Sequence, residues 1–140
     1  MRVKDIMTKD VASLNPEDST ERAAQLMKQY DIGSIPVCQQ QKVVGIVTDR
    51  DIALRSVAAG QDPRRQKVRE IMSPSPAVGD PEMDVHDAAR VMSEKQVRRL
   101  PIVDRGNLVG VVALGDISVE PSLADNAGQA LNQISQPAQM

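Results

Sequence analysis

Apolar side chains recur three or four positions apart in two segments of the chain, and this spacing is typical of one face of a helix. In the first segment they are Ala23, Met27 and Tyr30, and the segment begins at Ser19. A serine at this position accepts a hydrogen bond from the free amides of a helix start. The same pattern recurs after Asp84 and ends near Lys95. The spacing therefore predicts amphipathic helices over 19–30 and 84–95.

Two pairs of short apolar segments predict β-hairpins. The first pair is 35–39 and 43–48, and the second pair is 100–104 and 108–113, each joined by three polar or glycine residues. The inner strands, 43–47 and 108–112, are almost wholly apolar, which indicates strands covered on both faces. A further helix is expected after each hairpin, over about 49–59 and from about residue 115 onward.

These elements occur twice in the same order, because the chain is an internal repeat. When the sequence is shifted by 65 positions it aligns with itself without a gap, and 15 of the 50 pairs from Val3 to Ile52 are identical. We therefore expect an α/β (α+β) fold of two β-α-β-β-α units about a pseudo-two-fold axis. The predicted boundaries are 1–60 for the first unit, 61–67 for a linker, 68–120 for the second unit, and 121–140 for a C-terminal helix or flexible tail.

Composition excludes several classes of function. The chain has 17 basic and 19 acidic residues, so no overall positive charge would hold it on nucleic acid or an anionic membrane. It has one tyrosine and neither phenylalanine nor tryptophan, whereas proteins that bind single strands stack bases on aromatic rings. We expect neither a nucleic acid nor a membrane as partner.

Catalysis and metal binding are equally poorly supported. Cys38 and His86 are the only residues of their types, and a His/Cys metal site needs three or four ligands. We expect Cys38 to be a small core residue and His86 to be solvated. The sequence shows no P-loop and no paired acid and base, so we expect no enzymatic activity and no cofactor. No apolar region follows the N-terminus and no apolar run approaches a membrane span, so we expect a cytoplasmic protein.

Several motifs recur in both halves, and together they resemble the CBS domain. In the first half they are Ile6-Met7-Thr8, 31–37 and 45–52; in the second they are Ile71-Met72, 96–104, 110–112 and Asp116-Ile117. The paired form resembles a Bateman module, and is similar to small stand-alone bacterial CBS pairs of the hypoxic-response type. The resemblance covers about 3–119. It implies a homodimer that binds an adenine nucleotide and regulates a client protein, which the sequence does not identify.

The resemblance also implies a main ligand site. Thr48 would touch phosphate, Asp51 would hold the ribose hydroxyls, and Ile35, Pro36 and Val37 would flank adenine. Arg98 and Arg99 of the second half would reach the phosphate across the axis. The chemistry agrees, because a carboxylate can accept both ribose hydroxyls and aliphatic groups can enclose a base. Two alternatives remain open: Thr48 and Asp51 as a plain helix-capping pair, and the arginines as a solvated strand edge.

The second half departs from this pattern. Ala113 stands where the first half has Thr48, although Asp116 is kept, and the equivalents of Arg98 and Arg99 are the uncharged Gly33 and Ser34. We therefore expect a weak or empty second site. Its residues would be Asp116, Leu100, Pro101 and Ile102.

Two functions compete on this evidence. The first is a regulatory module that senses AMP, ADP or ATP, with S-adenosylmethionine as an alternative ligand. The second is a dimerisation or protein-interaction scaffold with a vestigial cleft.

Overall fold

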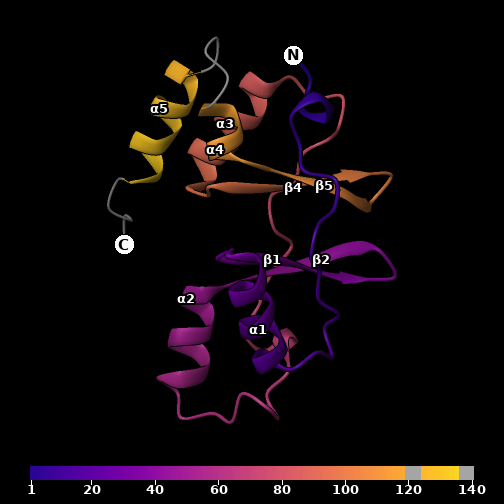
Figure 1. The fold of residues 1–140 in the computed structure, drawn as a ribbon, viewed down its shortest axis with the longest axis vertical. Helices are drawn as coiled ribbons and strands as arrows, with labels where there is room; N and C mark the ends of the chain where they lie inside the picture. The colour runs from indigo at the N-terminus through magenta and orange to yellow at the C-terminus, as the bar shows by residue number, and fades with distance from the viewer. Residues whose placement is uncertain (119–123, 136–140) are drawn as a thin grey trace. The chain divides into compact units, whose positions relative to one another are not determined.

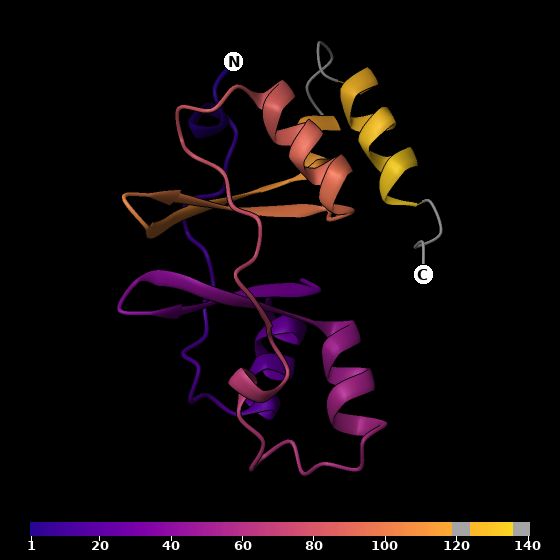
Figure 2. The same ribbon diagram turned by 180° about the vertical axis from the view of Figure 1, so that it is seen from behind.

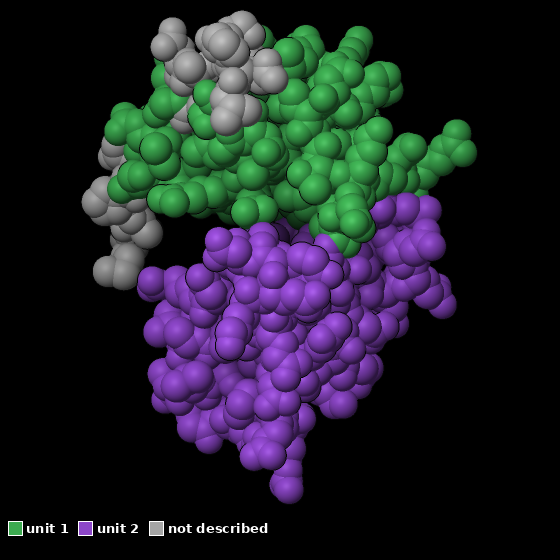
Figure 3. Space-filling model, in the orientation of Figure 1, with its two compact units in different colours: residues 1–11, 77–105, 109–140 green, residues 12–76, 106–108 purple. Residues whose placement is uncertain are grey.

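The computed structural model describes residues 1–118 and 124–135 of the 140-residue chain. It divides into two compact units (Figure 3). Unit 1 contains residues 1–11, 77–105 and 109–140, and unit 2 contains residues 12–76 and 106–108. The expected tail at 121–140 lies partly outside the described residues.

Unit 2 is built on the first hairpin, with helices on one side of it (Figures 1 and 2). Ser19 caps the first helix, because its hydroxyl accepts the N–H of Arg22 at 3.1 Å. Asp31 ends that helix in the left-handed conformation, at φ 53°. The elements of this unit are α1 (Thr20–Tyr30), β1 (Ser34–Gln39), β2 (Lys42–Thr48), α2 (Asp49–Ile52), the π-helical turn η2 (Ala53–Val57), the 3-10 turn η3 (Val68–Glu70) and β3 (Ser73–Pro74).

Strands β1 and β2 pair antiparallel, with Ile35 opposite Val47 and a bulge between Val37 and Cys38. Their buried side chains meet the apolar face of α1 and form the core of the unit. The core residues are Leu14, Ala23, Leu26, Met27, Ile35, Val37, Val47, Val68 and Ile71.

Unit 1 repeats this arrangement and adds one helix. Asp84 caps α3 by accepting the N–H of His86 at 2.8 Å. The elements are η1 (Val3–Asp5), α3 (Val85–Lys95), β4 (Arg99–Asp104), β5 (Asn107–Ala113, whose first two residues belong to unit 2), α4 (Leu114–Ser118) and α5 (Ala124–Ile134). The buried core contains Val3, Val85, Ala88, Ala89, Met92, Leu100, Ile102, Val112, Leu114, Ile117 and Ala130.

The compact units do not coincide with the sequence repeats, because each repeat's opening segment packs on the body of the other repeat. The N–H of Val3 donates to the carbonyl of Met83 at 2.8 Å, and the N–H of Val68 donates to the carbonyl of Asp18 at 2.9 Å. The predicted division at residues 60 and 67 follows the repetition of the sequence, whereas packing joins 1–11 to the second repeat and 61–76 to the first.

One local expectation differs from the structure. Gly45 and Val47 of β2 are buried, but Val44 and Ile46 keep partial exposure, so an apolar run alone did not establish that both faces are covered. Ahead of α1, Leu14 forms an isolated bridge with Val37. Among the described helices none has the length and apolar character needed to cross a membrane.

Candidate ligand-binding site

Thr48 and Asp51 exchange hydrogen bonds at the junction of β2 and α2. The N–H of Asp51 donates to the Thr48 hydroxyl at 3.1 Å, and the N–H of Thr48 donates to Oδ2 of Asp51 at 2.9 Å. This is a capping box, so the structure contains the hydrogen bonds that the capping alternative requires.

This arrangement leaves hydrogen-bonding capacity for a ligand. The Asp51 side chain is 14% exposed, and its second oxygen, Oδ1, lies 4.0 Å from a guanidinium nitrogen of Arg55. A carboxylate oxygen accepts more than one hydrogen bond, and a hydroxyl that accepts keeps its own hydrogen to donate. Capping therefore fixes the orientation of both groups without exhausting them.

The three residues expected beside adenine take different positions in β1. Ile35 and Val37 are fully buried and belong to the core of unit 2. Successive side chains of a strand point to opposite faces, so Pro36 points away from that core. Pro36 is buried as well, on the opposite face of the strand, and its contact with a base stays a prediction, while Ile35 and Val37 hold the strand in the core. Pro101 stands in the same relation to Leu100 and Ile102 in unit 1.

Asp116 reproduces half of the Thr48–Asp51 arrangement. Its Oδ2 accepts the N–H of Ala113 at 2.9 Å, but Ala113 has no hydroxyl to return a hydrogen bond. The second repeat therefore keeps the carboxylate in place and lacks the hydroxyl, as its sequence indicates.

Arg98 and Arg99 line a pocket of about 510 Å³ within unit 1. The other lining residues are Ala113, Leu114, Gly115, Ser118, Gly128 and Leu131. Among the described residues no carboxylate lines the pocket, and within 1–118 and 124–135 neither guanidinium takes part in a hydrogen bond or ion pair. The pocket is therefore suited to an anion. The combination of these arginines with Thr48 and Asp51 joins residues of two units and stays a prediction.

The equivalent positions of unit 2 are uncharged, and an acidic side chain lies beside them. Gly33 and Ser34 replace the arginines, and a Cβ on Gly33 would lie 3.2 Å from a carboxylate oxygen of Asp49. Leu114 is the counterpart of Asp49 in unit 1. Both residues make the same backbone hydrogen bond. The N–H of Asp49 donates to the carbonyl of Gly33 at 3.0 Å, and the N–H of Leu114 donates to the carbonyl of Arg98 at 2.8 Å. The same backbone arrangement therefore carries two arginines in one unit and a carboxylate beside an uncharged glycine in the other.

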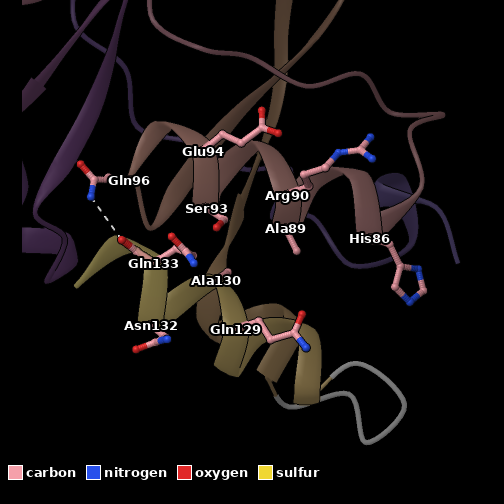
Figure 4. Close-up of a pocket in the computed structure, with 10 residues that line it drawn as sticks. All are labelled: His86, Ala89, Arg90, Ser93, Glu94, Gln96, Gln129, Ala130, Asn132 and Gln133. Atoms are coloured by element: carbon pink, nitrogen blue, oxygen red, sulfur yellow. Dashed lines mark hydrogen bonds between the residues drawn. The ribbon is translucent and has the colours of Figure 1, made fainter. Parts of the chain in front are cut away.

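A second hollow, of about 730 Å³, lies between α3 and α5 (Figure 4). Its charges are mixed, because Arg90 and Glu94 both line it, and Arg90 already pairs with Asp87 at 2.8 Å. The side chain of Gln96 donates to the backbone carbonyl of Gln133 at 3.2 Å and so links the two helices. This hollow shows no preference for a charged ligand.

Cys38 and His86 take no part in the candidate site. Partial burial raises the pKa of the Cys38 thiol, so the reactive thiolate is disfavoured. The exposed ring of His86 lies 2.7 Å from Asp84 Oδ1. In the part of the chain that the structure describes, no group of three or more His, Cys, Asp or Glu is arranged to hold a metal.

The family model for the CBS domain matches residues 3–57 and 68–120. CBS domain-containing protein YhcV of Bacillus subtilis is 49% identical over 133 residues, covering 95% of this chain and 94% of YhcV. The chain belongs to the CBS domain family. Since two CBS domains match in tandem, the internal repeat is a CBS pair and the predicted α/β architecture is confirmed.

Hypoxic response protein 1 of Mycobacterium tuberculosis is a further CBS relative, 35% identical over 82% of this chain and 81% of its own length. The crystal structure of Hypoxic Response Protein I with two coordinated zinc ions has a TM-score of 0.80 and 33% identity, covering 86% of this chain and 98% of that one. The predicted likeness to CBS pairs of the hypoxic-response type is therefore confirmed.

Two structural neighbours were solved with adenosine compounds. CBSX2 in complex with AMP has a TM-score of 0.73 and 29% identity, covering 89% of this chain and 97% of that one. The CBS pair of protein MJ0100, in complex with 5-methylthioadenosine and S-adenosyl-L-methionine, has a TM-score of 0.75 and 29% identity, covering 85% and 94%. Inosine-5'-monophosphate dehydrogenase of Korarchaeum cryptofilum matches over only 23% of its length, so that likeness carries no catalytic domain.

Proposed function

We propose that this CBS pair is a non-catalytic, cytoplasmic regulatory module that binds an adenosine-containing ligand, AMP, ADP or ATP, and signals its presence to a partner protein. The observation that carries the proposal is the Thr48–Asp51 pair. Its carboxylate is held in place by a backbone N–H at 2.9 Å and keeps an oxygen for a ligand. The AMP complex of CBSX2 supports the choice of ligand class.

Each part of the proposed main site supplies a different interaction. Asp51 accepts the ribose hydroxyls, the Thr48 hydroxyl donates to phosphate, and Pro36 flanks the base. Arg98 and Arg99 supply the positive charge, and their guanidiniums have no ionic partner in the described part of the chain. Hydrogen bonds between ionised groups are about twice as strong as neutral ones, so these arginines favour phosphate-bearing ligands.

The second cleft is proposed to bind weakly. It retains Asp116 and Pro101, the counterparts of Asp51 and Pro36. Leu100 and Ile102 are buried in the core of unit 1. The absence of a hydroxyl at Ala113 removes the group that touches phosphate in the proposed main site.

The module is also proposed to act as a homodimer. In unit 2, Val57 is 71% exposed, and Leu54 and Tyr30 are also exposed apolar side chains. Leu54 and Val57 lie three residues apart in η2, and exposed apolar side chains so close along one turn are typical of an association surface. The related CBS-CP12 protein is hexameric.

The scaffold function remains the second candidate, and one observation favours it. Thr48 and Asp51 satisfy each other's backbone amides, so they have a structural role without any ligand. Arg98 and Arg99 favour the regulatory module instead, because their guanidiniums have no ionic partner among the described residues and a scaffold does not need such a pair.

Calorimetric titration of the purified protein with AMP, ATP and S-adenosylmethionine tests the proposal. Saturable binding near one equivalent per chain supports the sensing function and identifies the ligand. No heat with any of the three, at protein concentrations well above micromolar, rejects it in favour of the scaffold.

A further inference from the structure

Helix α5 forms part of the Arg98–Arg99 pocket, although the repeat pattern gives it no counterpart. It lies beside α3 and α4 (Figures 1 and 2). Ala130 is 2% exposed and joins the core of unit 1, whereas Gly128 and Leu131 line the pocket. Ala130 therefore holds α5 against the core of unit 1, while Gly128 and Leu131 form part of the pocket wall.

Among the lining residues that the structure describes, Arg98 and Arg99 are the ones whose side chains have free hydrogen-bond donors. The Ser118 hydroxyl donates to the carbonyl of Gly115 at 2.8 Å, and the remaining lining side chains are apolar or glycine. An anion in this pocket would therefore depend on Arg98 and Arg99. A phosphate group suits them, because a guanidinium can hold two of its oxygens at once.

Two glycines line the pocket. A Cβ added to Gly128 or to Gly115 would meet no atom within 4 Å. The volume of about 510 Å³ lies inside the range of small-molecule sites, roughly 300–1,000 Å³. A methyl group at either position would therefore meet open space.

We propose that α5 is a ligand-dependent wall of the Arg98–Arg99 pocket. The phosphate-bearing end of the adenosine ligand lies against Arg98 and Arg99, and Gly128 and Leu131 of α5 enclose it. Binding and the seating of α5 then stabilise each other, because a coupling between two events acts equally in both directions. This inference rests on the proposed function and adds the element by which a partner could sense the ligand.

Size variants at Gly128 provide the test, using the full chain and titration with ATP and AMP. Gly128→Leu adds a large side chain at a position that lines the pocket and is expected to weaken binding about tenfold or more. Folding should not suffer, since leucine is a better helix former than glycine by about 1 kcal/mol. Asn132→Leu is the matched control: Asn132 is exposed on α5 and does not line this pocket. It is expected to bind as the wild type does.

Hydrogen exchange of the α5 backbone amides gives a second readout. Saturating ATP is expected to slow exchange in 128–134 of the wild type, and to slow it less in Gly128→Leu. If the wild type binds nucleotide, but Gly128→Leu binds equally well and exchange in α5 does not change, the inference is wrong and the proposed function stands. If the wild type binds no adenosine ligand, both are overturned.

Discussion

Met7 lies over Gly110, and a Cβ on that glycine would be 2.7 Å from the methionine sulfur and 2.9 Å from the carbonyl oxygen of Thr8. The sulfur could move, but the carbonyl could not, because Thr8 and Val111 exchange two backbone hydrogen bonds of 2.9 Å. The opening segment of the chain thus docks on unit 1 at a position where only glycine fits.

Gly110→Ala is therefore expected to lower the free energy of unfolding by about 1–3 kcal/mol, the usual cost of overpacking. Urea denaturation measures the change. Gly115→Ala is the control, since its added methyl group meets no atom within 4 Å. Equal stability of the two variants would show that the opening segment is not held as described.

The missing hydroxyl of the second repeat provides a reciprocal pair of variants. Thr48→Ala removes the acceptor for the N–H of Asp51 and should cost about 0.5–2 kcal/mol of stability, as for other helix caps. Ala113→Thr supplies that acceptor for Asp116 and should stabilise the protein. Thermal denaturation of both variants measures this, and a loss of stability in Ala113→Thr would mean that the two junctions are not equivalent.

Ionic strength should reveal the role of Arg98 and Arg99. Replacing both with glutamine is expected to weaken ATP binding and to reduce the dependence of affinity on salt, because screening acts on the attraction that these charges provide. The control replaces Arg64 and Arg65, which lie 3.9 and 3.8 Å from oxygens of Asp62. A control variant that loses as much affinity as Arg98→Gln/Arg99→Gln would point to a general charge effect.

The cap of α3 should depend on pH. The backbone N–H of His86 and then its ring hold the pKa of the Asp84 carboxyl below its ordinary value of 3.8. A lowered pKa in the folded protein adds stability above that ordinary value, and this contribution is lost as the pH falls through the folded pKa. Asp84→Ala should therefore cost stability at neutral pH and much less in strong acid.

Ser19→Ala is the matched comparison, because Ser19 caps α1 with a group that does not ionise. Ser19→Ala should lower the free energy of unfolding by a similar amount at neutral and at acid pH. Denaturant titrations of the two variants at neutral and acid pH compare them directly, and an Asp84→Ala cost that does not change with pH would contradict the assignment.

The helices and hairpins could be predicted because their signals are local. Ser19 and Asp84 cap the helices as expected, and the observed strands begin within one residue of the prediction. The docking of Met7 on Gly110 could not be predicted, because both repeats carry the same residues and local periodicity does not say which copy they pack against. The contribution of Gly128 and Leu131 to the Arg98–Arg99 pocket was missed for a related reason, since α5 has no copy in the first repeat.

The most direct test of the proposed main site compares Asp51→Ala with Asp116→Ala by calorimetric titration with the adenosine ligand that the wild type binds. The Asp51 variant should lose about 1.5–3 kcal/mol of binding free energy, the range for a hydrogen bond to a charged group, and the Asp116 variant should lose little. A greater loss in the Asp116 variant would contradict the assignment and place the competent site in the second repeat.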